Sequence, residues 1–200
     1  MNDQGNTVNI ETGGRRYHHG DLRAALIAAG IELLKTRSAE SLSLREVARA
    51  VAVSPTAVYR HFPDKQALLY AICEQTSEAL AQVQIDAMAS APNVREGFAA
   101  TGRAYVRFAL ANPAAFRLMM ATRPPPGGHF GANAELALAA MRVLRENVSA
   151  LLPPGASPTD QRLAAIHAWS LVHGMAMLML DEQIPADEEI IESIRNPLTR

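Results

Sequence analysis

The sequence has 200 residues, of which 48% are hydrophobic and 20% are charged, and its formal net charge is −1. A chain of this length and composition can bury a hydrophobic core, which excludes a disordered or a fibrous protein. The single cysteine, Cys73, excludes an internal disulfide and a four-cysteine zinc site, and the scarcity of aromatic residues beside abundant alanine and leucine favours helices over sheet.

The N-terminal part of the chain is first polar and then basic. Residues 1–14 have no hydrophobic periodicity and no apolar segment typical of a signal peptide, so we expect a disordered tail. Residues 15–65 carry nine Lys and Arg residues against five Asp and Glu residues, whereas the rest of the chain is net negative. A basic segment on an acidic body indicates binding to a polyanion, but an ordinary solvated surface gives the same pattern.

Three helices are predicted within the basic segment. Residues 19–36 have apolar residues at three- and four-residue spacing, the pattern of an amphipathic helix. The sequence Ser-Leu-Arg-Glu at 43–46 is a capping box that begins a short second helix. Ser54 followed by Pro55 predicts the start of a third helix, which we expect to run to about residue 61 because a proline follows at 63.

The second and third helices are separated only by residues 51–53, which is a helix-turn-helix pattern. In that motif the second short helix enters the major groove of DNA. Val58 faces inward on a helical wheel, and the candidates for DNA contact on the third helix are Ser54, Pro55, Thr56, Ala57 and Arg60. Groups that can donate to phosphate oxygens follow at Tyr59, His61 and Lys65.

Six further helices are predicted, over residues 65–90, 93–112, 113–122, 133–152, 158–181 and 187–194. The prolines and glycines of 123–128 indicate a loop. No strand alternation is present, so the sequence predicts an all-α protein of about nine helices. The longest nearly apolar run, 169–180, is shorter than the roughly 20 residues of a membrane-spanning helix, and we expect a cytoplasmic protein with no membrane contact.

No catalytic or metal-binding constellation stands out in the sequence. His18 and His19 are adjacent and would point about 100° apart on a helix. His167 and His173 lack the i, i+4 spacing of a helical two-histidine zinc site. Cys73 lies on an apolar stretch and is interpreted as a buried, inert thiol. We therefore predict no metal, no cofactor and no enzymatic activity.

Three segments together are typical of one protein family. They are Tyr-His-His-Gly-Asp-Leu-Arg at 17–23, Ser-Leu-Arg-Glu-Val-Ala at 43–48 and Val-Ser-Pro-Thr-Ala-Val-Tyr-Arg-His-Phe-Pro-Asp-Lys at 53–65. Through them, residues 17–72 resemble the DNA-binding domain of the TetR/AcrR family of bacterial transcriptional repressors. The resemblance implies a helix-turn-helix domain at 15–63, completed by the start of the helix at 64–90, and a C-terminal ligand-binding and dimerisation domain at 64–200.

The same resemblance implies a homodimer that binds a palindromic operator in double-stranded DNA and leaves it when a small-molecule effector binds. Phosphate anchors would be Ser43, Tyr59, His61 and Lys65. Candidates for base contact would be Arg45, Pro55, Thr56 and Ala57. The family usually has glycine in the tight turn where this chain has Ala52, and an alanine held at positive φ costs on the order of 1 kcal/mol.

The C-terminal half of the sequence resembles the family less specifically than the N-terminal part does. The segment Trp-Ser-Leu-Val-His-Gly at 169–174 resembles the Trp/His-Gly signature of one C-terminal subfamily. In the family the last two long helices form the dimer interface as a four-helix bundle, and close packing of another helix would explain Gly174. His173 is interpreted either as a buried, hydrogen-bonded structural residue or as a polar group of a ligand pocket.

Methionine and aromatic side chains suit a pocket for an apolar or amphipathic effector, and they also suit a plain core. The ligand-binding candidates are Phe98, Tyr105, Phe108, Met119, Met141, Trp169 and His173. Two alternatives to a repressor stay open. One is an architectural or non-specific DNA-binding protein, which the basic segment alone would support, and the other is a small helical enzyme, which rests only on an apolar cavity.

Overall fold

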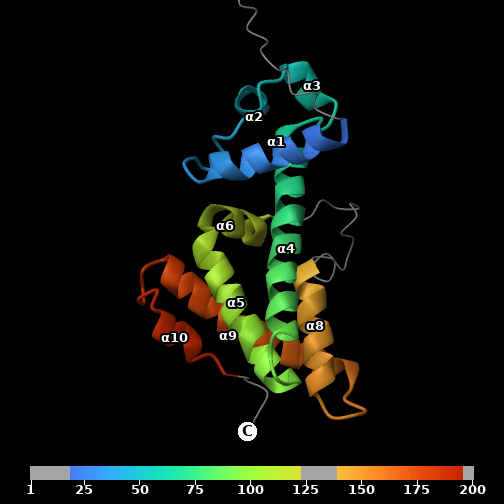
Figure 1. The fold of residues 1–200 in the computed structure, drawn as a ribbon, viewed down its shortest axis with the longest axis vertical. Coiled ribbons are helices and arrows are strands. Elements are labelled where there is room, and N and C mark those ends of the chain that lie inside the picture. Colours follow the sequence, from blue (N-terminus) through green and yellow to red (C-terminus); the bar gives the residue numbers. More distant parts are fainter. Residues whose placement is uncertain (1–18, 123–138, 196–200) are drawn as a thin grey trace, which may run out of the picture.

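Helices account for the fold of the residues that the computed structural model describes, 19–122 and 139–195, and no strand occurs among them (Figure 1). The nine helices are α1 (His19–Leu34), α2 (Leu44–Ala50), α3 (Pro55–Tyr59), α4 (Lys65–Ala89), α5 (Val94–Ala111), α6 (Pro113–Ala121), α8 (Ala139–Leu151), α9 (Pro158–Leu180) and α10 (Glu188–Glu192). The all-α prediction is confirmed. The expected tail at 1–14 and loop at 123–128 lie outside the described residues.

The helices begin where the capping residues predict. Ser43 Oγ accepts from the N–H of Glu46 at 3.3 Å, and the Glu46 carboxylate accepts from the N–H of Ser43 at 3.2 Å, so the capping box of α2 is confirmed. Ser54 Oγ accepts from the N–H of Ala57 at 3.2 Å and begins α3. A helix start is fixed by such local bonds, which satisfy N–H groups that have no partner within the helix.

Some helix ends differ from the prediction by one or two residues. α3 ends at Tyr59 rather than near residue 61, because the N–H groups of His61 and Phe62 both donate to the carbonyl oxygen of Val58 at 2.9 Å and close a turn. α1 ends at Leu34, and α10 covers only Glu188–Glu192 of the expected 187–194. The last helical turn tightens at such ends, where sequence patterns carry little information.

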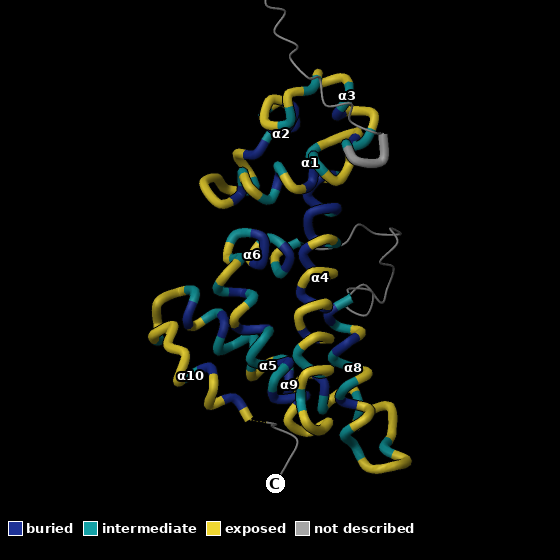
Figure 2. Tube along the Cα trace, viewed as in Figure 1, coloured by how far each residue is buried: buried dark blue, intermediate teal, exposed yellow. Residues whose placement is uncertain are grey.

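The first core lies between α1, α2, α3 and the start of α4. Its most enclosed members include Leu26, Val47, Val58, Phe62 and Leu68, none more than 2% exposed. Figure 1 shows α4 leaving this group as one long helix that continues down the molecule. The outer sides of α2 and α3 are largely exposed, as Figure 2 shows, so this small domain turns its helix-turn-helix toward solvent.

The lower part of α4 packs against α5, α6 and α8, and α9 packs against α5 and α8, so that these helices enclose two further clusters (Figure 1). The upper cluster, which we call the aromatic cluster, includes Tyr105, Phe116 and Met119. The lower cluster includes Phe98 and Val148. Burial of these side chains removes apolar surface from water and supplies most of the stability of such a bundle.

α6 joins the first core to the aromatic cluster. Leu118 packs against the first core and also against the aromatic cluster, while Phe116 of the same helix is fully buried in the latter. The guanidinium of Arg117 donates to the carbonyl oxygen of Leu180 at 2.9 Å and pairs with Asp181 at 2.5 Å. α6 is therefore bonded to the end of α9 while it also packs against the first core.

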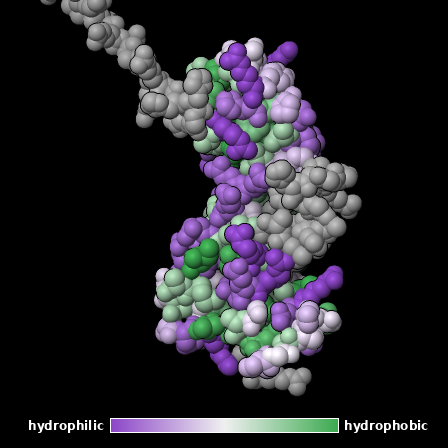
Figure 3. Space-filling model, turned by 90° about the vertical axis from the view of Figure 1, so that its right-hand side faces the viewer, coloured by the Kyte–Doolittle hydropathy of each residue, from purple (hydrophilic) through white to green (hydrophobic). Residues whose placement is uncertain are grey.

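One described helix, α9, is long and apolar enough to cross a membrane by length and composition, with a mean hydropathy of 1.6 over its best window. Only 28% of that window is buried inside the fold. Four of its large apolar residues are exposed, Leu163, Ile166, Leu171 and Leu178. Figure 3 shows hydrophobic areas in green on the lower half of the molecule, where the C-terminal helices lie.

Candidate nucleic-acid interface and ligand domain

The turn between α2 and α3 has the backbone that the helix-turn-helix motif requires. The N–H of Val53 donates to the carbonyl oxygen of Ala48 at 3.0 Å, and the N–H of Ala52 donates to that of Arg49 at 3.1 Å. This pair of bonds is a Schellman motif, whose left-handed residue is usually glycine. Ala52 occupies that position with φ of 57°. The chain therefore adopts the usual turn, with an alanine whose Cβ atom strains the left-handed backbone.

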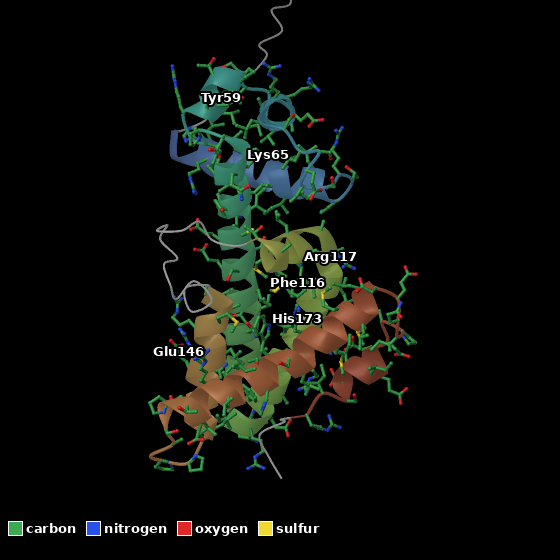
Figure 4. The ribbon with its side chains drawn as sticks, turned by 180° about the vertical axis from the view of Figure 1, so that it is seen from behind. Tyr59, Lys65, Phe116, Arg117, Glu146 and His173 are labelled. Atoms are coloured by element: carbon green, nitrogen blue, oxygen red, sulfur yellow. The ribbon has the colours of Figure 1, made fainter. Side chains whose placement is uncertain are left out.

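The turn presents the start of α3 to solvent. Ser54, Pro55 and Thr56 are exposed, and Ala57 is half-buried. Val58 is fully buried, as its inward position on the helical wheel predicts. Tyr59 is 50% exposed, which is unusual for a large aromatic side chain, and Arg60 is exposed beside it. Figure 4 shows Tyr59 at the end of the molecule farthest from His173.

Two of the predicted phosphate anchors already have partners within the chain. The ammonium of Lys65 donates to the carbonyl oxygens of Glu40 at 2.8 Å and Ala39 at 3.3 Å, which leaves one of its three protons for a phosphate. The hydroxyl of Ser43 donates to the Glu46 carboxylate at 2.9 Å within the capping box. Both residues therefore hold the local fold, and their phosphate roles stay predictions.

Among the other DNA-binding candidates, Arg45 is exposed on α2 and His61 is half-buried after α3. The cap also lowers the pKa of Glu46, mainly because Ser43 donates to its carboxylate, with a smaller contribution from Arg37. Arg37 bonds to Glu46 from the α1–α2 loop. The residues that hold α2 in place are thus distinct from the exposed Arg45, whose contact with DNA stays a prediction.

A hydrogen-bonded chain of rings crosses the aromatic cluster. The indole N–H of Trp169 donates to the Tyr105 hydroxyl at 3.1 Å, and that hydroxyl lies 3.0 Å from Nδ1 of His173. The tautomer of His173 sets the direction of this second bond: Tyr105 donates when the imidazole proton is on Nε2, and Nδ1–H donates to Tyr105 when the proton is on Nδ1. Phe116 stacks edge-on against Tyr105 with ring centroids 5.5 Å apart.

Burial sets the protonation of this chain of rings. It raises the pKa of Tyr105 to about 12, and it lowers the pKa of His173. The hydroxyl and the imidazole are therefore both neutral near pH 7. The aromatic cluster therefore holds neutral polar groups among apolar rings.

The seven ligand-binding candidates do not all come together. Tyr105 and Met119 belong to the aromatic cluster, and Phe108 and Trp169 pack against it. His173 contacts the cluster through the rings of Tyr105, Phe116 and Trp169. Phe98 lies instead in the lower cluster. Met141 is half-buried on α8 and belongs to neither cluster.

Sequence reasoning missed a small pocket beside the lower cluster, with a volume of about 30 Å³. It lies where α4, α5, α8 and α9 meet the segment after α10, and its polar residues are Gln84, Thr101 and Arg195. Gln84 and Thr101 are buried, although polar residues in helices usually face water. No spacing in a single sequence distinguishes them from surface residues.

Cys73 and the histidines yield no metal site in the part of the chain that is described. Within residues 19–122 and 139–195, no group of three His, Cys, Asp or Glu side chains could hold a metal ion. The thiol of Cys73 is buried, and this burial raises its pKa. The predicted inert thiol fits this environment because a protonated thiol is a poor nucleophile.

Family models match both parts of the chain. Residues 26–72 match the family described as "Bacterial regulatory proteins, tetR family". Residues 98–199, half of the chain, match the "Tetracyclin repressor-like, C-terminal domain". This second match does not confirm the Trp/His-Gly subfamily suggested by residues 169–174.

Several solved structures are similar over nearly the whole chain. A protein of unknown function from Rhodococcus sp. RHA1 is 30% identical, with a TM-score of 0.73 over 90% of this chain and 93% of that one. A bacterial regulatory protein in the tetR family from Rhodococcus RHA1 is 25% identical, with a TM-score of 0.61 over 86% and 90%. A TetR family transcription regulator from Marinobacter aquaeolei VT8 is 20% identical, with a TM-score of 0.60 over 85% and 89%, which shows a shared fold.

Proposed function

This chain belongs to the TetR family of bacterial regulatory proteins, and we propose that it is a transcriptional repressor that leaves its operator when a small-molecule effector binds the C-terminal helices. The observation that carries the proposal is the complete helix-turn-helix, with the first turn of α3 exposed. Members of the family are regulators rather than enzymes, and we propose the same for this chain, in the cytoplasm.

The exposed first turn of α3 recognises the DNA. Small side chains at Pro55 and Ala57 let the helix approach the base edges, where they can contact a thymine methyl group, and the Thr56 hydroxyl can bond a base or a phosphate. Arg45 and Arg60 add base or phosphate contacts. Ser43, Ser54, Tyr59, His61 and Lys65 contact the DNA backbone, which fixes the orientation of the protein on the duplex.

The exposed face of α9 supports a homodimer. Counting along the helix at 100° per residue, one face carries Leu163, His167, Ser170, Leu171, Gly174 and Leu178. All of these are exposed except the half-buried Gly174, and a Cβ atom built on Gly174 would meet nothing within 4 Å. An apolar helix face of this length calls for a partner. A second copy of the chain, packing α8 and α9 into a four-helix bundle, would cover it.

A symmetric dimer explains the expected operator. Its two recognition helices would enter successive major grooves, about 34–36 Å apart, so the operator is palindromic. The effector would bind better to a conformation in which this spacing is wrong, and it would shift the population toward that conformation. The contacts of α6 with the first core and with the aromatic cluster support a route between the two sites.

The test is selection of genomic fragments by the purified protein, followed by binding titrations at two salt concentrations. Recovery of a palindromic site would support the repressor and provide a probe for effectors, since an effector should release that fragment. Equal binding to every fragment with a steep salt dependence would favour the alternative, an architectural DNA-binding protein, because backbone contacts would then dominate.

A further inference from the structure

An arginine near the start of α1 lies over an aromatic ring of the DNA-binding domain. The guanidinium carbon (Cζ) of Arg23 is 5.4 Å from the centroid of the Phe62 ring. Arg23 is exposed, whereas Phe62 is 2% exposed and belongs to the first core. Because a cation is attracted to the negative face of a ring, the buried ring holds the end of a long and otherwise flexible side chain in place.

The donors of this guanidinium are left for another partner. Contact with a ring uses the charge of an arginine and does not require any of its five N–H groups. None of the ion pairs among the described residues involves Arg23, whereas Arg37, Arg103, Arg107 and Arg117 each pair with a carboxylate. Arg23 is thus an arginine that is positioned by a ring rather than by an acid.

Phe62 places the guanidinium beside the end of α3. The N–H groups of His61 and Phe62 both donate to the carbonyl oxygen of Val58 at 2.9 Å, so the ring is fixed just beyond Tyr59, the last residue of α3. Tyr59 and His61 are the predicted phosphate contacts of this region. Figure 1 shows the start of α1, at its dark blue end, below α3. The Arg23 guanidinium therefore lies near the place where we expect the DNA backbone to pass.

The charges of this region favour an anion. Arg60 is exposed next to Tyr59, and Lys65 begins α4. The acid nearest to Phe62 in sequence is Asp64, whose carboxylate accepts from the N–H of Ala67 at 2.8 Å and caps α4. A planar guanidinium with free N–H groups matches a phosphate well, because it can donate to two oxygens at once.

We propose that Arg23 donates to a phosphate of the DNA backbone while its guanidinium stays over Phe62. This contact ties α1 to the backbone next to the end of α3. Backbone contacts from two helices fix the angle at which α3 enters the groove, whereas contacts from α3 alone would let it rotate about them. The inference rests on the proposed function, since it requires that α3 faces DNA.

The salt dependence of DNA binding tests this contact. Arg23→Gln and the wild type are titrated with the operator and with a scrambled duplex between about 50 and 200 mM salt. Loss of a phosphate contact makes the slope of log K against log salt shallower by about 0.9 for each bound copy. We expect this change together with about three- to tenfold weaker binding of both duplexes, because a backbone contact carries no sequence preference. An unchanged slope overturns the proposal.

Two further variants separate a phosphate contact from other effects of charge. Arg23→Lys keeps a positive charge that can reach a phosphate, so it should keep the wild-type slope and lose less affinity than Arg23→Gln. Lys35→Gln removes a charge that pairs with Glu32 at the other end of α1, about 18 Å along the helix, and it should leave the slope unchanged. An equally shallow slope in Arg23→Lys or in Lys35→Gln contradicts the proposal.

A measurement on the wild-type protein does not depend on how well a variant folds. The ¹⁵Nε signal of Arg23 should shift in NMR when the scrambled duplex is added, and the absence of a shift would overturn the contact. Arg23→Gln should lower the Tm by no more than about 2–4 °C, because the lost contact with Phe62 lies at the surface. With a larger loss of Tm, the NMR shift decides.

Failure of this inference can be told apart from failure of the proposed function. If no operator is found, the repressor is rejected, but the scrambled duplex alone still gives the slopes and the NMR shift. A wild-type protein that binds no DNA rejects both the proposed function and the role of Arg23. DNA binding with the same slope in Arg23→Gln and in the wild type rejects the role of Arg23 alone.

Discussion

Ala52 is one of two non-glycine residues, with Glu182, that have a positive φ in the described part of the chain. It has φ of 57° at the position of the α2–α3 turn where a Schellman motif favours glycine. We expect Ala52→Gly to raise the free energy of unfolding by about 0.5–1 kcal/mol, because relief of the left-handed strain outweighs the greater freedom of glycine in the unfolded chain. Urea denaturation of the full chain measures this difference.

The matched control for that substitution lies two residues earlier. Ala50 is exposed and is the last residue of α2, with helical backbone. Ala50→Gly should therefore lower the free energy of unfolding, by about 0.5–1 kcal/mol, because glycine is a poor helix former. If the two variants change stability in the same direction, the strain assigned to Ala52 is wrong.

His173 links stability to pH. Burial lowers its pKa in the folded protein below the ordinary value of 6.5, so the unfolded chain binds a proton more readily than the folded chain does. Its contribution to stability is complete above pH 6.5 and is lost as the pH falls through the lower, folded pKa. We expect His173→Gln to lose less stability than the wild type between pH 7.5 and 5.5, measured by urea denaturation. An unchanged pH response would contradict this assignment.

At the scale of elements, α3 carries residues predicted to make two kinds of DNA contact, one to phosphates and one to bases. Tyr59→Phe removes a hydroxyl expected to contact a phosphate, so affinity for the operator and for a scrambled duplex should fall by the same factor, about three- to tenfold. Thr56→Val removes a hydroxyl at the exposed start of the helix, and it should weaken operator binding more than scrambled binding. Fluorescence anisotropy with both duplexes measures the two ratios. Equal losses in both variants would remove Thr56 from the base-contacting set.

Helix starts could be predicted from the sequence because their causes are local. Ser43 and Ser54 each bond an N–H group three residues ahead, and both residues are visible in the sequence as caps before apolar periodicity. The end of α3 could not be placed as well, because it depends on a turn in which two N–H groups share the Val58 carbonyl. Turn bonds of this kind leave no fixed residue pattern.

The candidate functional residues also fall into two groups, those that a local sequence pattern predicts and those that only the packing of helices brings together. The exposed residues of α3 follow from a short motif and its helical wheel, which are properties of consecutive residues. The aromatic cluster was predicted only in part, since the chain that joins Trp169, Tyr105 and His173 requires two helices to meet. Gln84 was not predicted at all, because its burial results from packing among four helices far apart in sequence.

At the scale of the whole molecule, α9 packs against the fold on one side and presents on the other an exposed face that we propose pairs with a second copy. Its buried residues, Ala165, Ala168, Ala176 and Met179, pack inside the chain, while its opposite face is apolar and exposed. Gly174 lies on that exposed face, and no atom of the described residues lies within 4 Å of a Cβ atom built there, so packing among those residues does not explain a glycine in the middle of a helix. A second α9 that crosses closely at this point would explain it.

The proposed dimer can therefore be tested with a substitution that leaves the fold of the single chain intact. Gly174→Leu adds a side chain into open space and improves helix propensity, so the isolated chain should fold at least as well as the wild type. In the dimer the same side chain would separate the two helices, and sedimentation equilibrium should show at least a tenfold weaker dimer. Ala111→Leu, at an exposed helical position on α5, is the control and should leave the dimer intact.

Since two recognition helices must act together on a palindrome, Gly174→Leu should also weaken operator binding. A Gly174→Leu protein that dimerises like the wild type would place the interface elsewhere and leave the exposed face of α9 without an explanation.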